Sequence, residues 1–201
     1  MSNLPLETTI NLILKRSIDV IVSLTVIFLF LSWFIPILAI IIKLTSRGPV
    51  FFIQKRSGKN GVLFNCIKLR SMYPNALANQ QQATENDNRI TWIGKFLRKF
   101  SLDELPQFIN VLIGQMSIIG PRPHMLKHTE TYSEIVEDYM DRLHVKPGIT
   151  GLSQVMGYRG EIKNRTMIAN RVRLDIFYIK KWSIGLDMHI AMKTVKLMLM
   201  G

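Results

Sequence analysis

The sequence predicts a mainly helical α+β fold, anchored to a membrane by a re-entrant amino-terminal helix. Three observations lead to this prediction: an uncharged stretch of membrane length near the start, one pair of strand-like segments, and helical hydrophobic periodicity in the second half. The chain has 201 residues, so one moderate domain plus an anchor is expected. We place the anchor and its flanks at residues 1–46 and a cytosolic, membrane-associated domain at residues 47–201.

The stretch from Val20 to Ile42 carries no charged side chain and is long enough to span the hydrocarbon core of a bilayer. It is too long for the apolar core of a cleaved signal peptide, and no small-residue cleavage site follows it. We therefore expect it to be retained. Pro36 lies inside the stretch and removes one helical hydrogen bond, which predicts a kink.

Basic residues flank both ends of this stretch, with Lys15 and Arg16 before it and Lys43 and Arg47 after it. Because basic flanks favour the cytoplasmic side, the pattern predicts a helix that bends and returns to the side from which it entered. The alternative is an ordinary, slightly kinked transmembrane helix, since proline is tolerated in such helices.

After the anchor, no second uncharged run of membrane length occurs, so we expect a globular domain on the membrane face. Val50 to Ile53 and Val62 to Ile67 have the composition of short strands, and the turn from Gly58 to Gly61 between them predicts a small β-hairpin. Ala76 to Asn88 is polar and rich in Gln and Asn, which favours an exposed loop or a frayed helix.

Helical periodicity returns at Ile93, where apolar and basic residues occupy opposite faces of one predicted helix. Such a helix suits an anionic membrane surface, although an ordinary solvated basic face gives the same pattern. Further amphipathic helices are predicted over Glu130 to Arg142 and Asn164 to Lys181, and an apolar helix over Asp187 to Met200. These surface helices complete the predicted domain.

The formal net charge is +12, which favours anionic partners such as nucleic acid, phospholipid headgroups or phosphorylated substrates. No RNA-recognition or zinc-finger signature accompanies the charge, and the long anchor also argues against nucleic acid. Membrane lipid and phosphorylated substrates remain the expected partners. The single cysteine, Cys66, excludes an intrachain disulfide, which fits a reducing compartment, and we expect it to be a small buried hydrophobe.

Two adjacent carboxylates, Asp103 and Glu104, are the strongest candidates for chemistry. Pro106 has no amide hydrogen and suits a first helical turn, so a helix is predicted to start near Asp103. The positive field of a helix start keeps carboxylates ionised, ready for nucleophilic attack or metal binding. The alternative is structural, because Ser101 and Glu104 also match a capping box.

Two loops carry candidate phosphate-binding residues. The loop from Gly120 to Pro123 is rigid and projects Arg122, whose guanidinium is shaped to grip a diphosphate by paired hydrogen bonds. The loop from Lys146 to Gly151 offers amides and an ammonium, although it lacks the spacing of a Walker loop. For both loops the alternative is an ordinary solvated turn.

Read in order, these residues resemble the bacterial sugar transferase family, the monotopic polyprenyl-phosphate phosphoglycosyl transferases. The resemblance runs from Lys15 to about Thr194, and the compact length is similar to short members that carry only the catalytic domain. The matching stretches are Lys15, Arg16 and Asp19; Gly48, Pro49 and Val50; Phe52, Gln54, Arg56 and Gly58; Lys68, Arg70, Ser71 and Met72; Arg89, Thr91, Gly94, Leu97 and Arg98; Asp103 to Gln107; Gly120 to Pro123; Lys146 to Gln154; and Trp182, Ser183 and Asp187.

The resemblance implies a transferase that moves a sugar 1-phosphate from a UDP-sugar to polyprenyl (undecaprenyl) phosphate, releasing UMP, in the first membrane step of bacterial glycan assembly. It implies that Asp103 is the nucleophile and forms a covalent phosphosugar, and that Glu104 binds Mg²⁺. It also implies that Arg122 contacts phosphate, with Lys68, Arg70 and Lys146 as further phosphate contacts.

The family's re-entrant helix is often broken at an adjacent Ser and Pro. Here Ser32 matches, Trp33 occupies the proline position, and Pro36 follows, so we expect the break at Ser32 and Pro36. The resemblance further implies a monotopic protein at the cytoplasmic face of the bacterial inner membrane, acting before downstream glycosyltransferases. The sugar, the glycan pathway and the formation of a homodimer are left open.

A non-enzymatic alternative has the same charge, anchor and surface helices. In this interpretation the chain is a membrane-anchored basic scaffold module that binds acidic lipid or assembles other proteins, and Asp103 and Glu104 only cap a helix. The position and partners of these two carboxylates in the fold should therefore distinguish the enzyme from the scaffold module.

Overall fold

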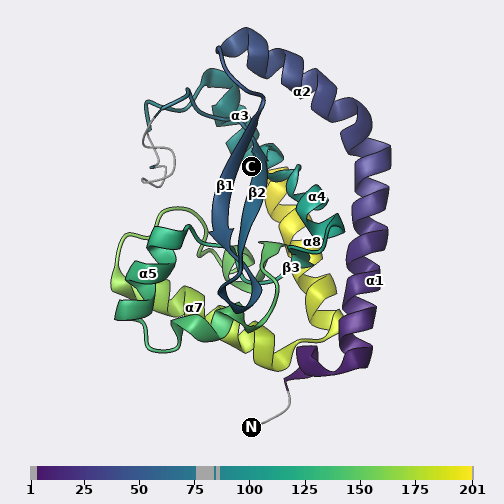
Figure 1. Cartoon of the computed structure of the whole chain (residues 1–201), viewed down its shortest axis with the longest axis vertical. Coiled ribbons are helices and arrows are strands. Elements are labelled where there is room, and N and C mark those ends of the chain that lie inside the picture. Colours follow the sequence, from purple (N-terminus) through teal and green to yellow (C-terminus); the bar gives the residue numbers. More distant parts are fainter. Residues whose placement is uncertain (1–3, 76–83, 85–86, 201) are drawn as a thin grey trace.

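In a computed structural model, which describes residues 4–75, 84 and 87–200, the chain has a mainly helical α+β fold. A long amino-terminal helix runs along one side and bends over the top, and the other elements lie beside it (Figure 1). A short 3₁₀ turn, η1 (Pro5–Glu7), precedes this helix. The predicted loop at Ala76 to Asn88 lies largely outside the described residues.

The long helix consists of α1 (Thr9–Val26), a π-helical turn (Ile27–Leu31) and α2 (Ser32–Thr45). The wide π turn is closed by the Ser32 amide, which donates to the Ile27 carbonyl. Pro36 then removes one amide from the first part of α2. These two features account for the bend between α1 and α2 in Figure 1.

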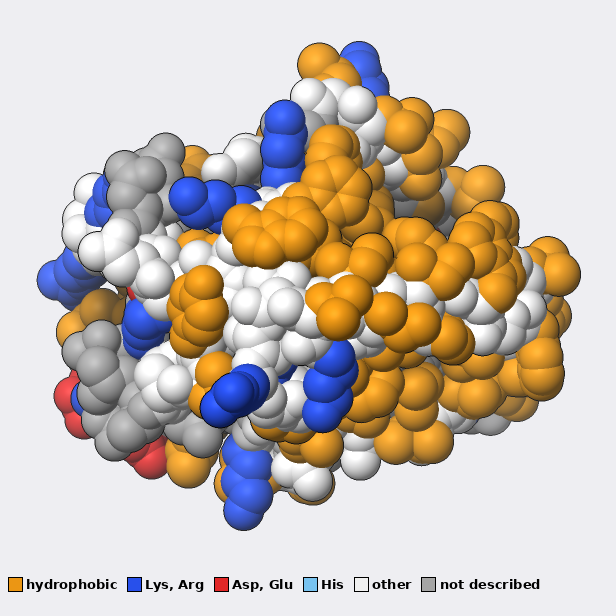
Figure 2. All heavy atoms as spheres, turned by 90° about the horizontal axis from the view of Figure 1, so that it is seen from above, with side chains coloured by type: hydrophobic (Ala, Val, Ile, Leu, Met, Phe, Trp, Pro, Cys, Tyr) orange, Lys and Arg blue, Asp and Glu red, His pale blue; other side chains and the backbone are white. Residues whose placement is uncertain are grey.

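The helix from Thr9 to Thr45 is long and apolar enough to cross a membrane, judged by length and composition. Only 17% of its most apolar window is buried, so it is not the core helix of a globular domain. Seen from above, hydrophobic side chains cover one side of the molecule almost continuously, and Lys and Arg side chains are scattered over the rest of this face (Figure 2).

The predicted hairpin is confirmed. Strand β1 (Phe51–Ser57) pairs antiparallel with β2 (Leu63–Leu69), and the 3₁₀ turn η3 (Lys59–Gly61) joins them. Gly61 has a φ of 77°, a left-handed value that glycine adopts without strain. Cys66 is buried on the inner face of the hairpin, as expected from the sequence, and packs in one cluster with Val111 and Met116.

The helix predicted after Ile93 is α3 (Trp92–Lys99), and Thr91 caps it by accepting a hydrogen bond from the Gly94 amide. Its buried residues Ile93 and Leu97 pack against Leu38 and Ile42 of α2. The end of the long helix is therefore fixed to the domain. The opposite face of α3 exposes Trp92 and Phe96.

A second, parallel strand pair was not predicted. Strand β3 (Ser117–Ile119) pairs with β4 (Gly148–Thr150), which places part of the predicted Lys146 loop in a sheet. The strands are too short for hydrophobic alternation to reveal them. The 3₁₀ turn η4 (Leu102–Glu104) and α4 (Gln107–Leu112) precede β3, and α6 (Leu152–Val155) follows β4.

The single helix predicted over Glu130 to Arg142 is wrong. Helix α5 (Leu126–Ile135) ends where Val136 is extended, and a separate 3₁₀ turn, η5 (Tyr139–His144), follows. The last two helices match the prediction closely, as α7 (Arg165–Lys181) and α8 (Ile184–Met200). Helix α7 supplies Ile168 and Val172 to one buried cluster and Tyr178 and Ile179 to another.

Candidate active site

Asp103 and Glu104 lie in the turn η4, between α3 and α4, and both side chains are buried. Ser101 begins this turn in the left-handed conformation, with a φ of 58°. The predicted helix start near Asp103 is therefore a 3₁₀ turn, and α4 begins at Gln107 with Pro106 at its cap position. The turn holds the two carboxylates before the first turn of α4.

The capping alternative is contradicted by the geometry of Ser101. Its side chain makes no capping hydrogen bond to the turn, and its hydroxyl accepts a hydrogen bond from Arg159 instead. The Glu104 side chain does not complete a box either, because its oxygens are bound by cations. Glu104 is therefore held by something other than helix capping.

Glu104 is paired with two cations that come from different elements. Its Oε1 accepts from Lys68 Nζ of β2 at 2.7 Å and from Arg122 Nη2 at 2.6 Å, and its Oε2 accepts from Arg122 Nη1 at 3.1 Å. Burial alone would raise the pKa of Glu104, but the charges of Arg122 and Lys68 hold it well below its ordinary value. Glu104 is therefore ionised and fixed in place.

Asp103 differs from its neighbour, because its carboxylate forms no hydrogen bond or ion pair with the part of the chain that the structure describes. Burial, and then the negative charge of Glu104, raise the pKa of Asp103 to about 6. A carboxylate that is mostly ionised at neutral pH and holds no fixed partner keeps its lone pairs for attack on an electrophile. This is the arrangement of a nucleophile beside an electrostatic partner.

Arg122 is presented by the loop predicted from the sequence, and that loop is held from behind. Arg142 Nη2 donates to the Arg122 carbonyl at 2.7 Å, and Arg56 Nη1 donates to the Pro123 carbonyl at 3.3 Å. Arg142 in turn forms an ion pair with Asp175 of α7 at 2.8 Å, and both side chains are 1% exposed. Ser153 completes the network by donating to Asp175 Oδ1 at 2.8 Å.

Sequence reasoning missed this support for Arg122. Arg56 was quoted only as part of a motif, and Arg142 and Asp175 were assigned to amphipathic helices. No local pattern joins Arg142 to a carboxylate of α7, because their contact depends on tertiary packing.

Arg171, one turn before Asp175, is another buried arginine near this loop, with 3% of its surface exposed. Burial, followed by the charge of Arg122, lowers the pKa of Arg171 to about 10. The surroundings of Arg122 are therefore strongly basic and suited to a phosphorylated ligand.

Of the predicted phosphate contacts, Lys68 and Arg122 meet at Glu104, whereas Arg70 does not. The Arg70 guanidinium donates to the carbonyls of Ser46 at 2.7 Å and Arg47 at 3.2 Å, at the end of α2. Arg70 thus caps the long helix, as cations do at helix carboxyl ends. Its contact with phosphate stays a prediction.

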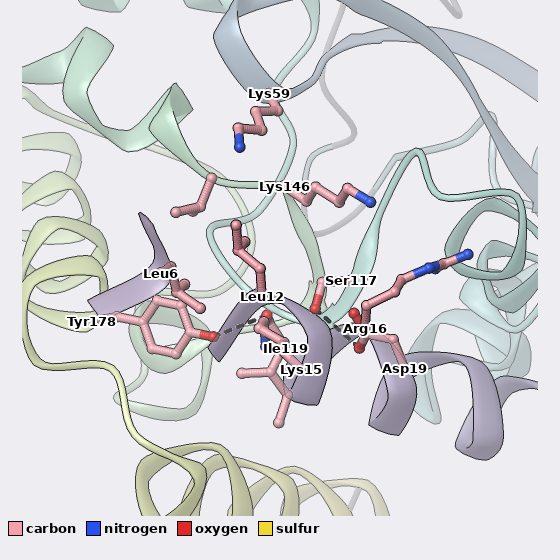
Figure 3. A pocket seen from close by; sticks show the side chains of 11 residues that line it. Leu6, Leu12, Lys15, Arg16, Asp19, Lys59, Ser117, Ile119, Lys146 and Tyr178 are labelled. Atoms are coloured by element: carbon pink, nitrogen blue, oxygen red, sulfur yellow. Dashed lines mark hydrogen bonds between the residues drawn. The ribbon is translucent and has the colours of Figure 1, made fainter. Parts of the chain in front are cut away.

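Lys146 also lies apart from Glu104. It lines a pocket beside α1 together with Lys59, Arg16 and Asp19, as Figure 3 shows. As with Arg70, contact of Lys146 with phosphate stays a prediction.

The two residues of the predicted helix break lie at different places. Ser32 directly follows the π turn, and Pro36 lies within α2.

Mg²⁺ binding by Glu104 stays a prediction, and Glu104 is the residue of η4 that could hold the ion. Mg²⁺ keeps several waters and is bound through one or two carboxylates plus substrate phosphates. Glu104 is held ionised, and its Oε2 accepts only the longer of the two Arg122 bonds, so a lone pair remains. No group of three or more His, Cys, Asp or Glu residues gathers anywhere among the described residues, so substrate oxygens would have to complete the coordination.

The chain has many relatives among characterised proteins. It is 48% identical, over 189 residues, to a UDP-glucose:undecaprenyl-phosphate glucose-1-phosphate transferase of Klebsiella pneumoniae, a match that covers 92% of this chain and 40% of that protein. It is 39% identical to a UDP-N-acetylgalactosamine-undecaprenyl-phosphate N-acetylgalactosaminephosphotransferase of Aeromonas hydrophila, covering 98% of this chain and 46% of that protein.

A third relative is similar in length. The exopolysaccharide production protein PSS of Rhizobium leguminosarum is 41% identical, and the match covers 92% of this chain and 94% of that protein. Against the first two relatives, the chain spans less than half of their length. The model of the bacterial sugar transferase family matches residues 10–201, from the start of α1 through η4 to the end of α8. The chain therefore belongs to the bacterial sugar transferase family.

Proposed function

We propose that the chain is a phosphoglycosyl transferase that moves a sugar 1-phosphate from a UDP-sugar to polyprenyl phosphate. The observation that carries this proposal is the contrast within η4, where Glu104 is fixed by Lys68 and Arg122 while the adjacent Asp103 has no partner among the described residues. Relatives are named for this kind of reaction with undecaprenyl phosphate. The products are UMP and a polyprenyl-diphosphate-sugar.

The proposed reaction has two displacements at the same phosphorus atom. An oxygen of the Asp103 carboxylate attacks the phosphorus that carries the sugar, and the bond from that phosphorus to the UMP oxygen breaks. UMP leaves with the electron pair, and a phosphosugar remains on Asp103. An oxygen of polyprenyl phosphate then attacks the same phosphorus and displaces the carboxylate, which restores Asp103.

Glu104 and the basic residues around it are proposed to manage charge during these steps. Glu104 would hold Mg²⁺, and the bound ion would offset the charge of the diphosphate and of the departing UMP. Arg122 can turn its paired donors from Glu104 to a phosphate, because a guanidinium recognises carboxylate and phosphate with the same geometry. The buried pair of Arg142 and Asp175 keeps the loop of Arg122 in place.

We further propose that the long helix is re-entrant and that the protein lies at the cytoplasmic face of the inner membrane. The π turn at Ile27–Leu31, the following Ser32 and the missing amide of Pro36 support a bend within the apolar run. Labelling of single cysteines at Glu7 and Lys55, in a Cys66→Ser background, tests this placement. Both sites should react from the same side, and reaction from opposite sides would establish a spanning helix.

The activity is tested by measuring UMP release from a panel of UDP-sugars, with the protein in nanodiscs that contain undecaprenyl phosphate. UDP-glucose comes first, because relatives with 48% and 47% identity are named for it. Asp103→Asn should abolish UMP release while the thermal unfolding temperature stays unchanged. Release by the variant at the wild-type rate would exclude Asp103 as the nucleophile, and no release by the wild type with any UDP-sugar would favour the scaffold alternative.

A further inference from the structure

A second basic site lies beside the amino-terminal half of α1, apart from η4. The pocket there has an apolar floor that includes Leu6, Ile119 and Tyr178, all of them buried. Cations from three separate segments line it, as Figure 3 shows: Arg16 of α1, Lys59 of the hairpin turn η3, and Lys146 just before β4. The pocket thus combines an apolar floor with positively charged walls.

The positive charge of this pocket is not balanced by the protein. Lys15 is paired with Asp187 at 2.7 Å, but within residues 4–75, 84 and 87–200 neither the Lys59 ammonium nor the Lys146 ammonium forms a hydrogen bond or an ion pair. Asp19 is the acid among the lining residues, and its Oδ1 already accepts from Ser117 Oγ at 3.0 Å and from the Ile118 amide at 2.9 Å. The charge of Asp19 acts on Lys146 from a distance, but neither ammonium group has an anion in hydrogen-bond contact.

Arg16 and Lys146 approach each other at Gly114, where the chain turns between α4 and β3. A Cβ atom at Gly114 would lie 3.6 Å from Lys146 Nζ and 3.7 Å from Arg16 Nη2. Arg16 is fixed there by donating to the carbonyls of Val111 at 2.6 Å and Leu112 at 2.7 Å. Lys146 is half-buried, and burial, followed by the charge of Arg16, lowers its pKa. An anion bound at this point would favour the charged form of Lys146 and offset its repulsion from Arg16.

The sequence of α1 places this pocket at the level of lipid phosphates, provided that the proposed membrane placement is correct. The charged residues of α1 end at Asp19, and the uncharged stretch begins at Val20. If that stretch lies in hydrocarbon, Arg16 and Asp19 lie at its boundary with the headgroups. Ile10 and Ile13, in the turns of α1 before Arg16, are 77% and 62% exposed. Basic pockets at this depth bind lipid headgroups.

We propose that this pocket binds the phosphate of an anionic lipid headgroup, through Lys59 and Lys146 together with the fixed guanidinium of Arg16. The apolar floor then receives the first carbons of the lipid. The site is separate from Glu104, whose cations are Lys68 and Arg122. The phosphate chemistry is shared by two sources, the membrane phospholipids and the polyprenyl phosphate carrier.

The test measures binding of the full chain to phosphatidylcholine vesicles with and without phosphatidylglycerol, or with undecaprenyl phosphate in its place. Lys59→Gln and Lys146→Gln should each weaken the preference for anionic vesicles by about fivefold. Lys146→Arg should keep the preference, which separates loss of charge from misfolding. The matched control is Lys163→Gln, an exposed lysine outside the pocket, and it should bind as the wild type does.

The arms of the experiment distinguish the sources and the two proposals. A lysine-dependent gain with phosphatidylglycerol assigns the site to phospholipid, and one with undecaprenyl phosphate alone assigns it to the carrier. Equal loss in the Lys163→Gln control, no loss in either pocket variant, or full competition by inorganic phosphate at low millimolar concentration would overturn the inference. Failure to bind any vesicle would instead contradict the membrane placement, and UMP release in detergent tests the activity independently of both.

Discussion

The turn η4 and the docking site of α1, by which we mean Lys15, Arg16 and Asp19 with their partners in the domain, both contain buried charged residues, but the two regions use them differently. In the docking site, every charge that the family motif supplies has a fixed partner: Lys15 is paired with Asp187, Asp19 accepts from Ser117, and Arg16 donates to the end of α4. In η4, Glu104 is paired twice and the adjacent Asp103 has no partner among the described residues.

The difference separates charges that hold the fold from the carboxylate that is proposed to react. The charged groups of the docking site exchange their hydrogen bonds to water for fixed hydrogen bonds within the protein. These bonds stabilise the junction between the long helix and the domain. A carboxylate in a buried turn that accepts no hydrogen bond has the opposite effect, because the nearby cations offset only part of its desolvation. Such an arrangement is retained where the group has another use, and the use that we propose here is attack on phosphorus.

Glu104→Gln should have the largest effect on rate of these substitutions. It removes the charge that Lys68 and Arg122 surround and the proposed ligand of Mg²⁺, so UMP release should fall by about 1000-fold. The measurement is UMP release at saturating UDP-sugar, with chelation by EDTA as a second arm. The matched control is Glu130→Gln, an exposed residue of α5, which should retain the wild-type rate. A loss below tenfold in a folded Glu104 variant would remove Glu104 from the mechanism.

Arg142→Gln should mainly lower stability, because it leaves the buried Asp175 carboxylate without its cation. The expected loss in the free energy of unfolding is about 3 kcal/mol, measured by urea denaturation in detergent. The control is Arg173, an exposed residue of α7, the helix that carries Asp175. Arg173→Gln should change the free energy of unfolding by less than about 0.5 kcal/mol. Equal stability of both variants would show that the buried pair does not support the loop of Arg122.

The fold around these residues was predictable where the signal is local. Pro and Gly spacing gave the hairpin, and apolar periodicity gave α3 and α7. The parallel pair β3 and β4 was not predictable, because each strand has three residues and its partner lies far along the chain. The extended Val136 that ends α5 early is likewise set by tertiary packing rather than by helix propensity.

The sequence predicted which residues belong to the candidate site, but not which residues they contact. The motif identified Asp103, Glu104, Arg122 and Lys68, and the structure brings the last three together from separate elements. The same reasoning also grouped Arg70 with them, although its guanidinium binds the end of α2. A motif records which residue is present, whereas the contact that it makes depends on how distant segments pack.

Asp187→Asn should reduce stability by a smaller amount than Arg142→Gln. Asp187 accepts from Lys15 at 2.7 Å, Tyr178 at 2.9 Å and Trp182 at 3.0 Å, and the neutral amide weakens these bonds by about 2 kcal/mol in total. UMP release at saturating substrate should change less than twofold. A fall in UMP release of more than twofold in the folded variant would show that the docking site also affects the reaction, contrary to the difference from η4 described above.

Arg70→Lys should have the smallest effect, because lysine keeps the charge at the end of α2 but loses the paired donors. The expected cost is about 1 kcal/mol in the free energy of unfolding, with an unchanged KM for the UDP-sugar. A rise in KM without loss of stability would instead support the phosphate contact predicted from the sequence.

Formation of a covalent bond at Asp103 is the central claim, and intact-protein mass spectrometry tests it most directly. The protein is incubated with a UDP-sugar that supports UMP release, in the absence of polyprenyl phosphate, and its mass is recorded before and after addition of the carrier. The wild type should gain the mass of one sugar phosphate less one water, localised to Asp103 by peptide mapping, and lose it when polyprenyl phosphate is added. An adduct of equal abundance on Asp103→Asn, or UMP release by the wild type without any adduct, would contradict the account.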